Sequence, residues 1–197
     1  MNHNQEQDAK QRILLAARKC FAAYGFDRTS VRQICEEAGV NVALVSYHFG
    51  GKENLFYALF EAYFPKKEEA ERMKVEDPVG AVKLLIEEIT RMRIHYPELI
   101  SLLQQEIALM SPRIPIIRQH AFPIWERLRE VLQAGKDQKQ FDFESLDQAM
   151  LFVLGSLFIH KQWPYFEPIM SDPQPNFEAS VSYATFFILR GLGCSDS

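Results

Sequence analysis

Cysteine is scarce in this sequence, and the three present, Cys20, Cys35 and Cys194, include no CxxC pair. An odd number without that spacing gives no zinc or dithiol motif. Cys20 and Cys35 fall on apolar faces of expected helices, where a thiol usually acts as a small buried hydrophobe. A redox-sensing role is the less favoured alternative, with Cys194 as its most exposed candidate.

Long apolar runs are also missing. The longest, residues 149–159, is interrupted by Gly155 and Ser156 and is shorter than the roughly 20 residues that cross a bilayer. No N-terminal segment joins a basic flank to an apolar run, as a secretory signal does. The sequence therefore predicts a cytoplasmic protein that makes no use of a membrane.

An excess of positive charge, expected of many nucleic-acid-binding proteins, is absent as well. The net charge is −4, and residues 1–65 hold equal numbers of basic and acidic side chains. Placement still favours an anionic partner, because Arg28, Arg32 and Lys52 flank expected helix N-termini, which themselves bind phosphate.

What the sequence does contain is helical periodicity. A hydrophobic content of 47% over 197 residues excludes a disordered chain and allows one or two domains with a true core. Apolar residues recur every three or four positions, and no useful window alternates with a period of two. The predicted fold class is all-α.

Residues 29–52 carry the most specific pattern. A short helix is expected over residues 30–38, with Thr29 and Ser30 at its start and Gly39 at its end. Asn41 then caps a second helix over residues 42–49, whose buried side carries Val45 and Phe49. Two short helices joined by a Gly-containing turn form a helix-turn-helix, which presents its second helix to the DNA major groove.

The remaining helices follow from proline, glycine and capping residues. Residues 8–24 form a helix that packs on this pair, with Phe26 and Phe49 filling the space between. Lys52 opens another helix, and we place the domain boundary at residue 64. This gives a three-helix N-terminal helix-turn-helix domain (1–64) and a helical C-terminal effector-binding and dimerisation domain (65–197). The C-terminal helices are expected over residues 66–76, 78–96, 97–110, 112–135, 146–162 and 177–190.

The first 60 residues resemble the DNA-binding segment of the TetR family of regulators. The resemblance is carried by four short motifs: Thr29-Ser30-Val31-Arg32, Gly39-Val40-Asn41, Ser46-Tyr47-His48-Phe49 and Lys52-Glu53-Asn54-Leu55. It implies a sequence-specific DNA-binding transcriptional regulator, expected to be a repressor and to associate with the nucleoid. One departure is clear: Val42-Ala43-Leu44-Val45-Ser46 stands where many members have Lys-Gly-Thr-Leu-Tyr.

The resemblance also assigns roles to individual residues. Contacts to DNA phosphate are implied for Thr29, Ser30, Tyr47, His48 and Lys52. Contacts to base edges in the groove are implied for Arg32, Asn41, Val42, Ala43, Leu44 and Ser46. Arg32 is suited to a bidentate contact with guanine, whereas Val42 and Leu44 offer only apolar contact.

A homodimer is implied too, formed by residues 146–162 and the last helix, and it would bind a pseudo-palindromic operator. A small apolar effector is expected in the C-terminal domain, since large apolar side chains with a few polar tips are typical of ligand pockets. The candidates are Met92, His95, Tyr96, Phe122, Trp125, Phe152 and His160. Plain core packing is the alternative reading of the same residues.

Two other functions stay open. The segment at residues 163–175, WPYFEPIMSDPQP, resembles the sporulation-linked RefZ kind of TetR protein, which suggests an effector-independent chromosome-site-binding protein that acts through protein partners. A helical protein-interaction module without DNA binding is the third reading. We expect no enzyme, no catalytic residue, no cofactor and no metal, because GxSxG, HExxH and a complete phosphate loop are missing. A metal site built from His95, His120, His160 and Glu106 is the least favoured alternative.

Overall fold

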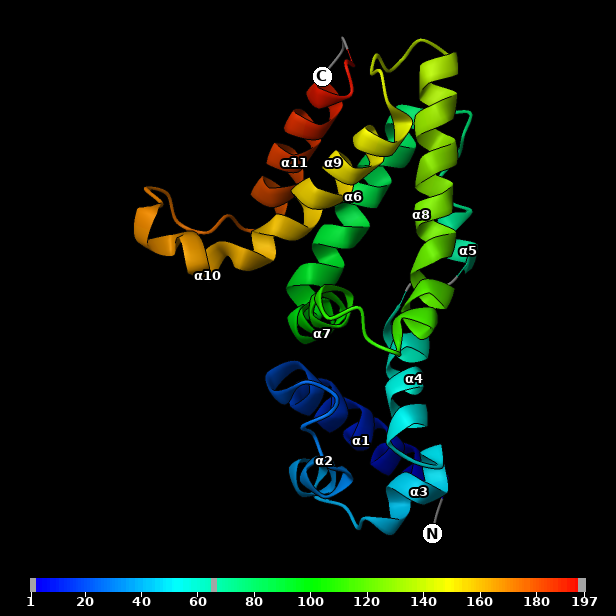
Figure 1. Cartoon of the computed structure of the whole chain (residues 1–197), viewed down its shortest axis with the longest axis vertical. Coiled ribbons are helices and arrows are strands. Elements are labelled where there is room, and N and C mark those ends of the chain that lie inside the picture. Colours follow the sequence, from blue (N-terminus) through cyan, green and yellow to red (C-terminus); the bar gives the residue numbers. More distant parts are fainter. Residues whose placement is uncertain (1–2, 65–66, 195–197) are drawn as a thin grey trace. The chain divides into compact units, whose positions relative to one another are not determined.

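The structure is a computed structural model that describes residues 3–64 and 67–194, and within these residues it contains helices and no strands (Figure 1). This confirms the predicted all-α class. The chain divides into two compact units. The first comprises residues 3–64 and 98–121, and the second comprises residues 67–97 and 122–194. The 98–121 segment therefore belongs structurally with the N-terminal helices, although it follows the predicted functional boundary at residue 64.

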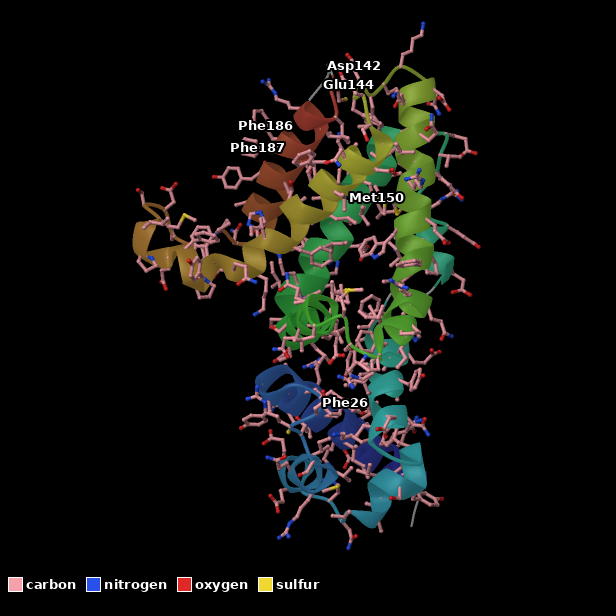
Figure 2. The ribbon with its side chains drawn as sticks, viewed as in Figure 1. Phe26, Asp142, Glu144, Met150, Phe186 and Phe187 are labelled. Atoms are coloured by element: carbon pink, nitrogen blue, oxygen red, sulfur yellow. The ribbon has the colours of Figure 1, made fainter. Side chains whose placement is uncertain are left out.

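The first unit begins with four helices: α1 (His3–Tyr24), α2 (Val31–Ala38), α3 (Ala43–Phe49) and α4 (Lys52–Tyr63). Most of α7 (Pro97–Ala108) and the start of α8 (Ile114–Asp137) complete it. Its core contains an aromatic cluster in which Phe26 lies 5.3 Å from both Phe21 and Phe56, centroid to centroid (Figure 2). Phe26 and Phe49 are both buried, as expected for the side chains that close the helical bundle.

The turns of this unit are formed where glycine permits a left-handed backbone. Gly39 has φ 63° and ends α2, where its N–H donates to the carbonyl of Glu36. Gly25, at φ 77°, ends α1 in the same way, with its N–H donating to the carbonyl of Phe21 at 2.8 Å. These two turns set the directions in which α2 and α3 leave.

The second unit is built on α6 (Pro78–His95), α9 (Leu146–Phe158), α11 (Phe177–Gly191) and the part of α8 after residue 121. Each of the first three helices is preceded by a capping residue, whose side chain accepts a hydrogen bond from the backbone N–H three positions later. The capping residues are Asp77, Ser145 and Asn176. Their inward faces form one apolar core that includes Val82, Ile86, Leu128, Val153 and Ile188.

Three predicted helices differ from the observed ones by more than two residues. The first begins at His3, whereas its predicted start is residue 8. Residues 67–76 form only the short α5 (Lys67–Ala70) followed by turns, and residues 65–66 lie outside the described residues. The turns are fixed by packing, since Met73 is buried and its carbonyl accepts from Arg127 Nε at 2.6 Å. The charged pattern of this stretch therefore does not make one solvated helix.

The helix predicted over 146–162 is also shorter. It ends at Phe158 and continues as the 3₁₀ turn η1 (Ile159–Gln162), α10 (Trp163–Phe166) and the 3₁₀ turn η2 (Glu167–Ile169). Pro164 and Pro168 lie at the starts of the last two elements, where a missing N–H costs no helical bond. Within the second unit this segment extends away from α9 and α11 (Figure 1).

Candidate nucleic-acid interface

The short helix α3 presents a distinct exposed face. Val45 and Phe49 are buried, and Ala43, Ser46 and Tyr47 are exposed, with Tyr47 at 70%. Positions three and four apart share one side of a helix, so these three side chains line the solvent face together. Val42 precedes them and is 47% exposed, whereas Leu44 is half-buried.

Asn41 lies in the turn before this helix. Its side-chain oxygen accepts a hydrogen bond from the N–H of Ala43 at 2.9 Å. This bond closes the turn before α3, but the residue directly before the helix is Val42, whose side chain makes no capping hydrogen bond, so Asn41 is not the N-cap that the sequence predicts. Its remaining amide donors face solvent, because the residue is exposed.

The N-terminus of α2 is ordered by a capping box. Ser30 Oγ accepts from the backbone N–H of Gln33 at 3.2 Å, and the Ser30 N–H donates to Gln33 Oε1 at 2.8 Å. Gln33 was not among the candidate residues, although the spacing Ser-x-x-Gln is a sequence signal for this motif. Ser30 stays exposed at the first turn, where unpaired N–H groups attract anions.

Thr29 does not lie where its predicted role needs it. Its side chain is 1% exposed, and its hydroxyl donates to the carbonyl of Gly25 at 2.8 Å, with the carbonyl of Cys20 at 3.1 Å. A buried hydroxyl with these partners is not presented to a phosphate. The residue instead ties the turn after α1 to the helix before it.

Lys52 makes structural contacts and also keeps a donor for the predicted phosphate contact. Its Nζ donates to the carbonyls of Phe26 (3.0 Å) and Thr29 (2.9 Å), and it lies 4.3 Å from the centroid of the Phe26 ring. An ammonium group has three N–H donors, so one remains for an anion. Lys52 thus holds the turn that leads into α2.

The other two charged or titratable candidates differ in accessibility. Arg32 is exposed, and its Nε pairs with Glu36 Oε1 at 3.0 Å one turn further along α2. His48 is half-buried between Tyr47 and Phe49, and its Nε2 is enclosed with no hydrogen-bond partner among the described residues. Arg32 is therefore available to a ligand once a weak surface pair opens.

Contacts between α1 and α2 orient the helix pair, and no sequence motif marks them. Arg12 Nη1 donates to the carbonyl of Ala38 at 3.3 Å, at the last turn of α2. Lys19 Nζ pairs with Glu37 at 3.0 Å on the same helix. Such contacts join residues 18 to 26 positions apart, which local periodicity does not reveal.

Two of the seven candidate effector residues, Phe152 and His160, line cavities of the second unit. Phe152 is 72% exposed and lines a cavity between α9 and α11, whereas His160 lines two cavities near α10. Trp125 packs on the apolar core, 6.1 Å from Phe158. The other four are half-buried or exposed: Met92, His95, Tyr96 and Phe122.

The alternative metal site also finds no geometric support. Among the described residues, no group of three or more His, Cys, Asp and Glu side chains is placed to hold a metal ion. Likewise, no helix in the described part of the chain is both long and apolar enough to cross a membrane.

Residues 13–59 match the family model described as bacterial regulatory proteins, tetR family. The chain is 31% identical over 202 residues to the transcriptional repressor NicS of Pseudomonas putida, covering 95% of this chain and 94% of that protein. It is 41% identical over 79 residues to the repressor AcnR of Corynebacterium glutamicum, and there it spans only 39% of the relative's length.

The regulator YttP of Bacillus subtilis is 26% identical over 165 residues, which cover 81% of this chain and 78% of that protein. Among solved structures, HlyIIR, a hemolysin II transcriptional regulator, superimposes with a TM-score of 0.71 at 28% identity. That superposition covers 91% of this chain and 98% of HlyIIR.

A short helix with a capping box, followed by a second short helix with an exposed face, forms a helix-turn-helix. Together with the match of nearly the whole chain to the repressor NicS, it defines a helix-turn-helix transcriptional regulator. The match to NicS extends over both units of the chain, beyond the helix-turn-helix itself. The chain belongs to the TetR family of transcriptional regulators.

Proposed function

We propose that the protein is a homodimeric repressor that binds a pseudo-palindromic operator through α3. The observation that carries this proposal is the exposed face of α3, with Ala43, Ser46 and Tyr47 on one side and Val45 and Phe49 holding the other side in the core. Ser46 and Tyr47 supply hydroxyl groups, and Val42 with Ala43 supplies apolar contacts of the kind that thymine methyl groups make.

Phosphate contacts are assigned to Ser30, Tyr47 and the third N–H of Lys52, on either side of the groove. The backbone N–H groups at the start of α2 add a site for an anion. Arg32 is assigned to a base or phosphate after it leaves Glu36, at a cost of about 0–1 kcal/mol for such an exposed pair. Thr29 and the enclosed Nε2 of His48 are given supporting roles only, because neither is accessible.

The dimer is assigned to the exposed apolar faces of α9 and α11. Phe186 and Phe187 lie on α11 (Figure 2). Leu151 and Phe152 lie on α9. These large side chains are between 44% and 72% exposed in one protomer. Contiguous apolar surface of this kind marks a protein interface. Two copies would place two α3 helices on half-sites about 34–36 Å apart, or a multiple of that distance.

Release by a small effector completes the proposed cycle. An effector weakens DNA binding only to the extent that it binds the DNA-free form more tightly. The protein would act in the cytoplasm, on the nucleoid.

The test is a selection from random duplexes followed by gel shifts with single variants. Tyr47→Ala should weaken binding at least tenfold, because one face of α3 loses its largest exposed side chain. Tyr165→Ala, at an exposed tyrosine of α10, is the matched control and should leave affinity unchanged. If no duplex is enriched, or if both tyrosine variants bind like the parent, α3 is not the DNA-reading element.

A second candidate function is a chromosome-site-binding protein of the RefZ kind, which acts through protein partners and needs no effector. The 26% identity to YttP, which is the protein of the RefZ kind in Bacillus, favours it. So do the exposed Tyr165 and Ile169, which lie in the RefZ-like segment 163–175. It predicts the same DNA binding without any ligand-dependent change in melting temperature or DNA affinity. A helical interaction module, the third reading, predicts no DNA binding at all.

A further inference from the structure

One cavity of the second unit has an unusual collection of charges. It has a volume of about 330 Å³ and is bordered by the end of α6, by the η1–α10 segment and by the start of α11. Arg93, His160 and Lys161 contribute basic side chains to its lining, and none of the described residues that line it is an aspartate or a glutamate. This gathering is notable in a chain whose net charge is −4.

Arg93 is the side chain that most needs a partner. It is half-buried on the last turn of α6, and its enclosed Nε has no hydrogen-bond partner among the described residues. Burial lowers the pKa of its guanidinium, because the charged form loses hydration. By contrast, Arg91, two residues earlier, pairs with Glu87 at 2.7 Å. An enclosed guanidinium N–H without a hydrogen-bond partner is costly, and an anion at this position would supply the missing contact.

The rest of the lining is mostly apolar and would contact an uncharged part of a ligand. Ile94, Pro97, Trp163, Pro164 and Pro175 give the cavity an apolar and aromatic wall. Its volume lies at the small end of the range for ligand sites, about 300–1,000 Å³. A planar guanidinium donates two parallel hydrogen bonds to a carboxylate, a geometry that a single point charge does not reproduce.

We propose that this cavity binds a small organic acid, with the carboxylate on Arg93 and the apolar or aromatic body against Trp163 and the prolines. Lys161 flanks the carboxylate and adds positive potential, and the imidazole of His160 lies at the same rim as a hydrogen-bonding group. The proposal rests on the proposed function in one respect only: the acid is assigned as the effector. It refines the predicted apolar effector by giving it a charged head, and it moves the site from the seven predicted residues to one that shares only His160 with them.

Binding is measured directly on the DNA-free full-length protein by calorimetry, with octanoate and benzoate as probes. Octanamide and benzamide keep the body of each probe without its charge, and inorganic phosphate offers charge without an apolar body. At least one acid should bind, its amide should bind at least tenfold more weakly, and phosphate should not compete. Acids that do not bind at millimolar concentration, amides that bind equally, or binding of phosphate alone would overturn the proposal.

Arg93→Gln should weaken binding of the acid at least tenfold. Arg91→Gln, on the same helix and outside the cavity lining, should leave the affinity for the acid unchanged. Should Arg93→Gln fail to fold, as judged by circular dichroism, Lys161→Gln and His160→Gln test the same site at its rim and should each weaken binding severalfold. Unchanged affinity in these variants contradicts the proposal. A change in dimer dissociation without a change in acid affinity would instead assign Arg93 to a second copy of the chain.

These outcomes are separate from those of the DNA experiments. Acid binding without any effect on the DNA complex leaves the site intact and removes its role as the effector site. Conversely, failure of the duplex selection does not alter a dissociation constant measured without DNA.

Discussion

The first unit contains a buried ion pair between Glu106 and Arg113. Glu106 is 2% exposed and accepts from Arg113 Nε at 2.9 Å and from the hydroxyl of Ser111. The same guanidinium lies 4.1 Å from the centroid of the Phe26 ring and reaches Asp27 at 3.4 Å. The corner between α7 and α8 is thus fastened to the turn before α2.

Arg113→Leu should destabilise the protein by about 3–5 kcal/mol, because it leaves a buried carboxylate without its cation. The double variant Glu106→Leu/Arg113→Leu should recover most of that loss, since no unpaired charge remains. Urea unfolding of both variants measures the difference. Arg32→Leu breaks an exposed pair and should cost under about 1 kcal/mol, and an Arg113 effect no larger than this control would contradict the account.

The two buried cysteines behave as small apolar side chains. Burial raises the pKa of the Cys20 thiol, with a smaller contribution from the carboxylate of Glu37, and burial likewise raises the pKa of Cys35. A thiolate is the reactive form, so both residues are protected in the folded chain. This supports the reading of these two residues as small buried hydrophobes over a redox sensor.

These pKa shifts predict a pH dependence of stability. The unfolded thiols ionise near their ordinary pKa of 9.0, before the folded ones do, so unfolding releases protons above that pH. The stability that the two protonated, buried thiols contribute is fully present below pH 9. It is lost as the pH rises through the raised pKa values of the folded state. The free energy of unfolding from pH 8 to 10.5 should therefore fall less steeply in Cys20→Ala/Cys35→Ala than in the parent. Equal slopes in the parent and the double variant would show that these thiols do not contribute, and Cys194→Ala serves as control.

At the scale of the helices, proline, glycine and capping residues were sufficient to predict most boundaries. Ser30 and Gly39 define α2, and Ser145 and Asn176 define the starts of α9 and α11. Such signals are local, so a single sequence contains them. The 67–76 stretch was predicted wrongly, because the buried Met73 and its bond to Arg127 depend on a residue 54 positions away.

The candidate site was predictable to a similar degree. The exposed and buried faces of α3 follow from helical spacing around Val45 and Phe49. Helical spacing does not predict which hydroxyl groups are accessible, since Thr29 is buried and its neighbour Ser30 is exposed. The orphaned Arg93 was missed for the same reason: its surroundings come from segments about 70 to 90 residues further along the chain.

The apolar faces of α9 and α11 make a prediction at this scale. Gly155 lies on the exposed face of α9 with open space where a side chain would begin, so Gly155→Glu leaves the protomer unstrained. A charge there should weaken the dimer at least tenfold by sedimentation equilibrium, because it would be buried between apolar surfaces. Tyr165→Glu, in α10, should not, and a Gly155→Glu protein that stays fully dimeric would assign the interface elsewhere.

At the scale of the whole molecule, the charge balance is the strongest argument against DNA binding. Seven basic and seven acidic side chains occur in residues 1–65, so affinity must come from the placement of a few groups. Ser30, Tyr47 and Lys52, together with the N-terminus of α2, are the groups assigned to phosphate. Each phosphate neutralised by a cation contributes a slope of about −0.9 to the dependence of log K on log salt.

Phosphate contact by this charge-balanced domain is tested by the salt dependence of binding to the selected duplex, measured with the dimer between 50 and 200 mM salt, a range of about fourfold. We expect log K to fall linearly with log salt. The stoichiometry should be one dimer per pseudo-palindrome, and Tyr47→Ala should lower affinity at every salt concentration. Binding that does not change with salt, or no binding to any duplex, would contradict the proposed contact with DNA phosphate.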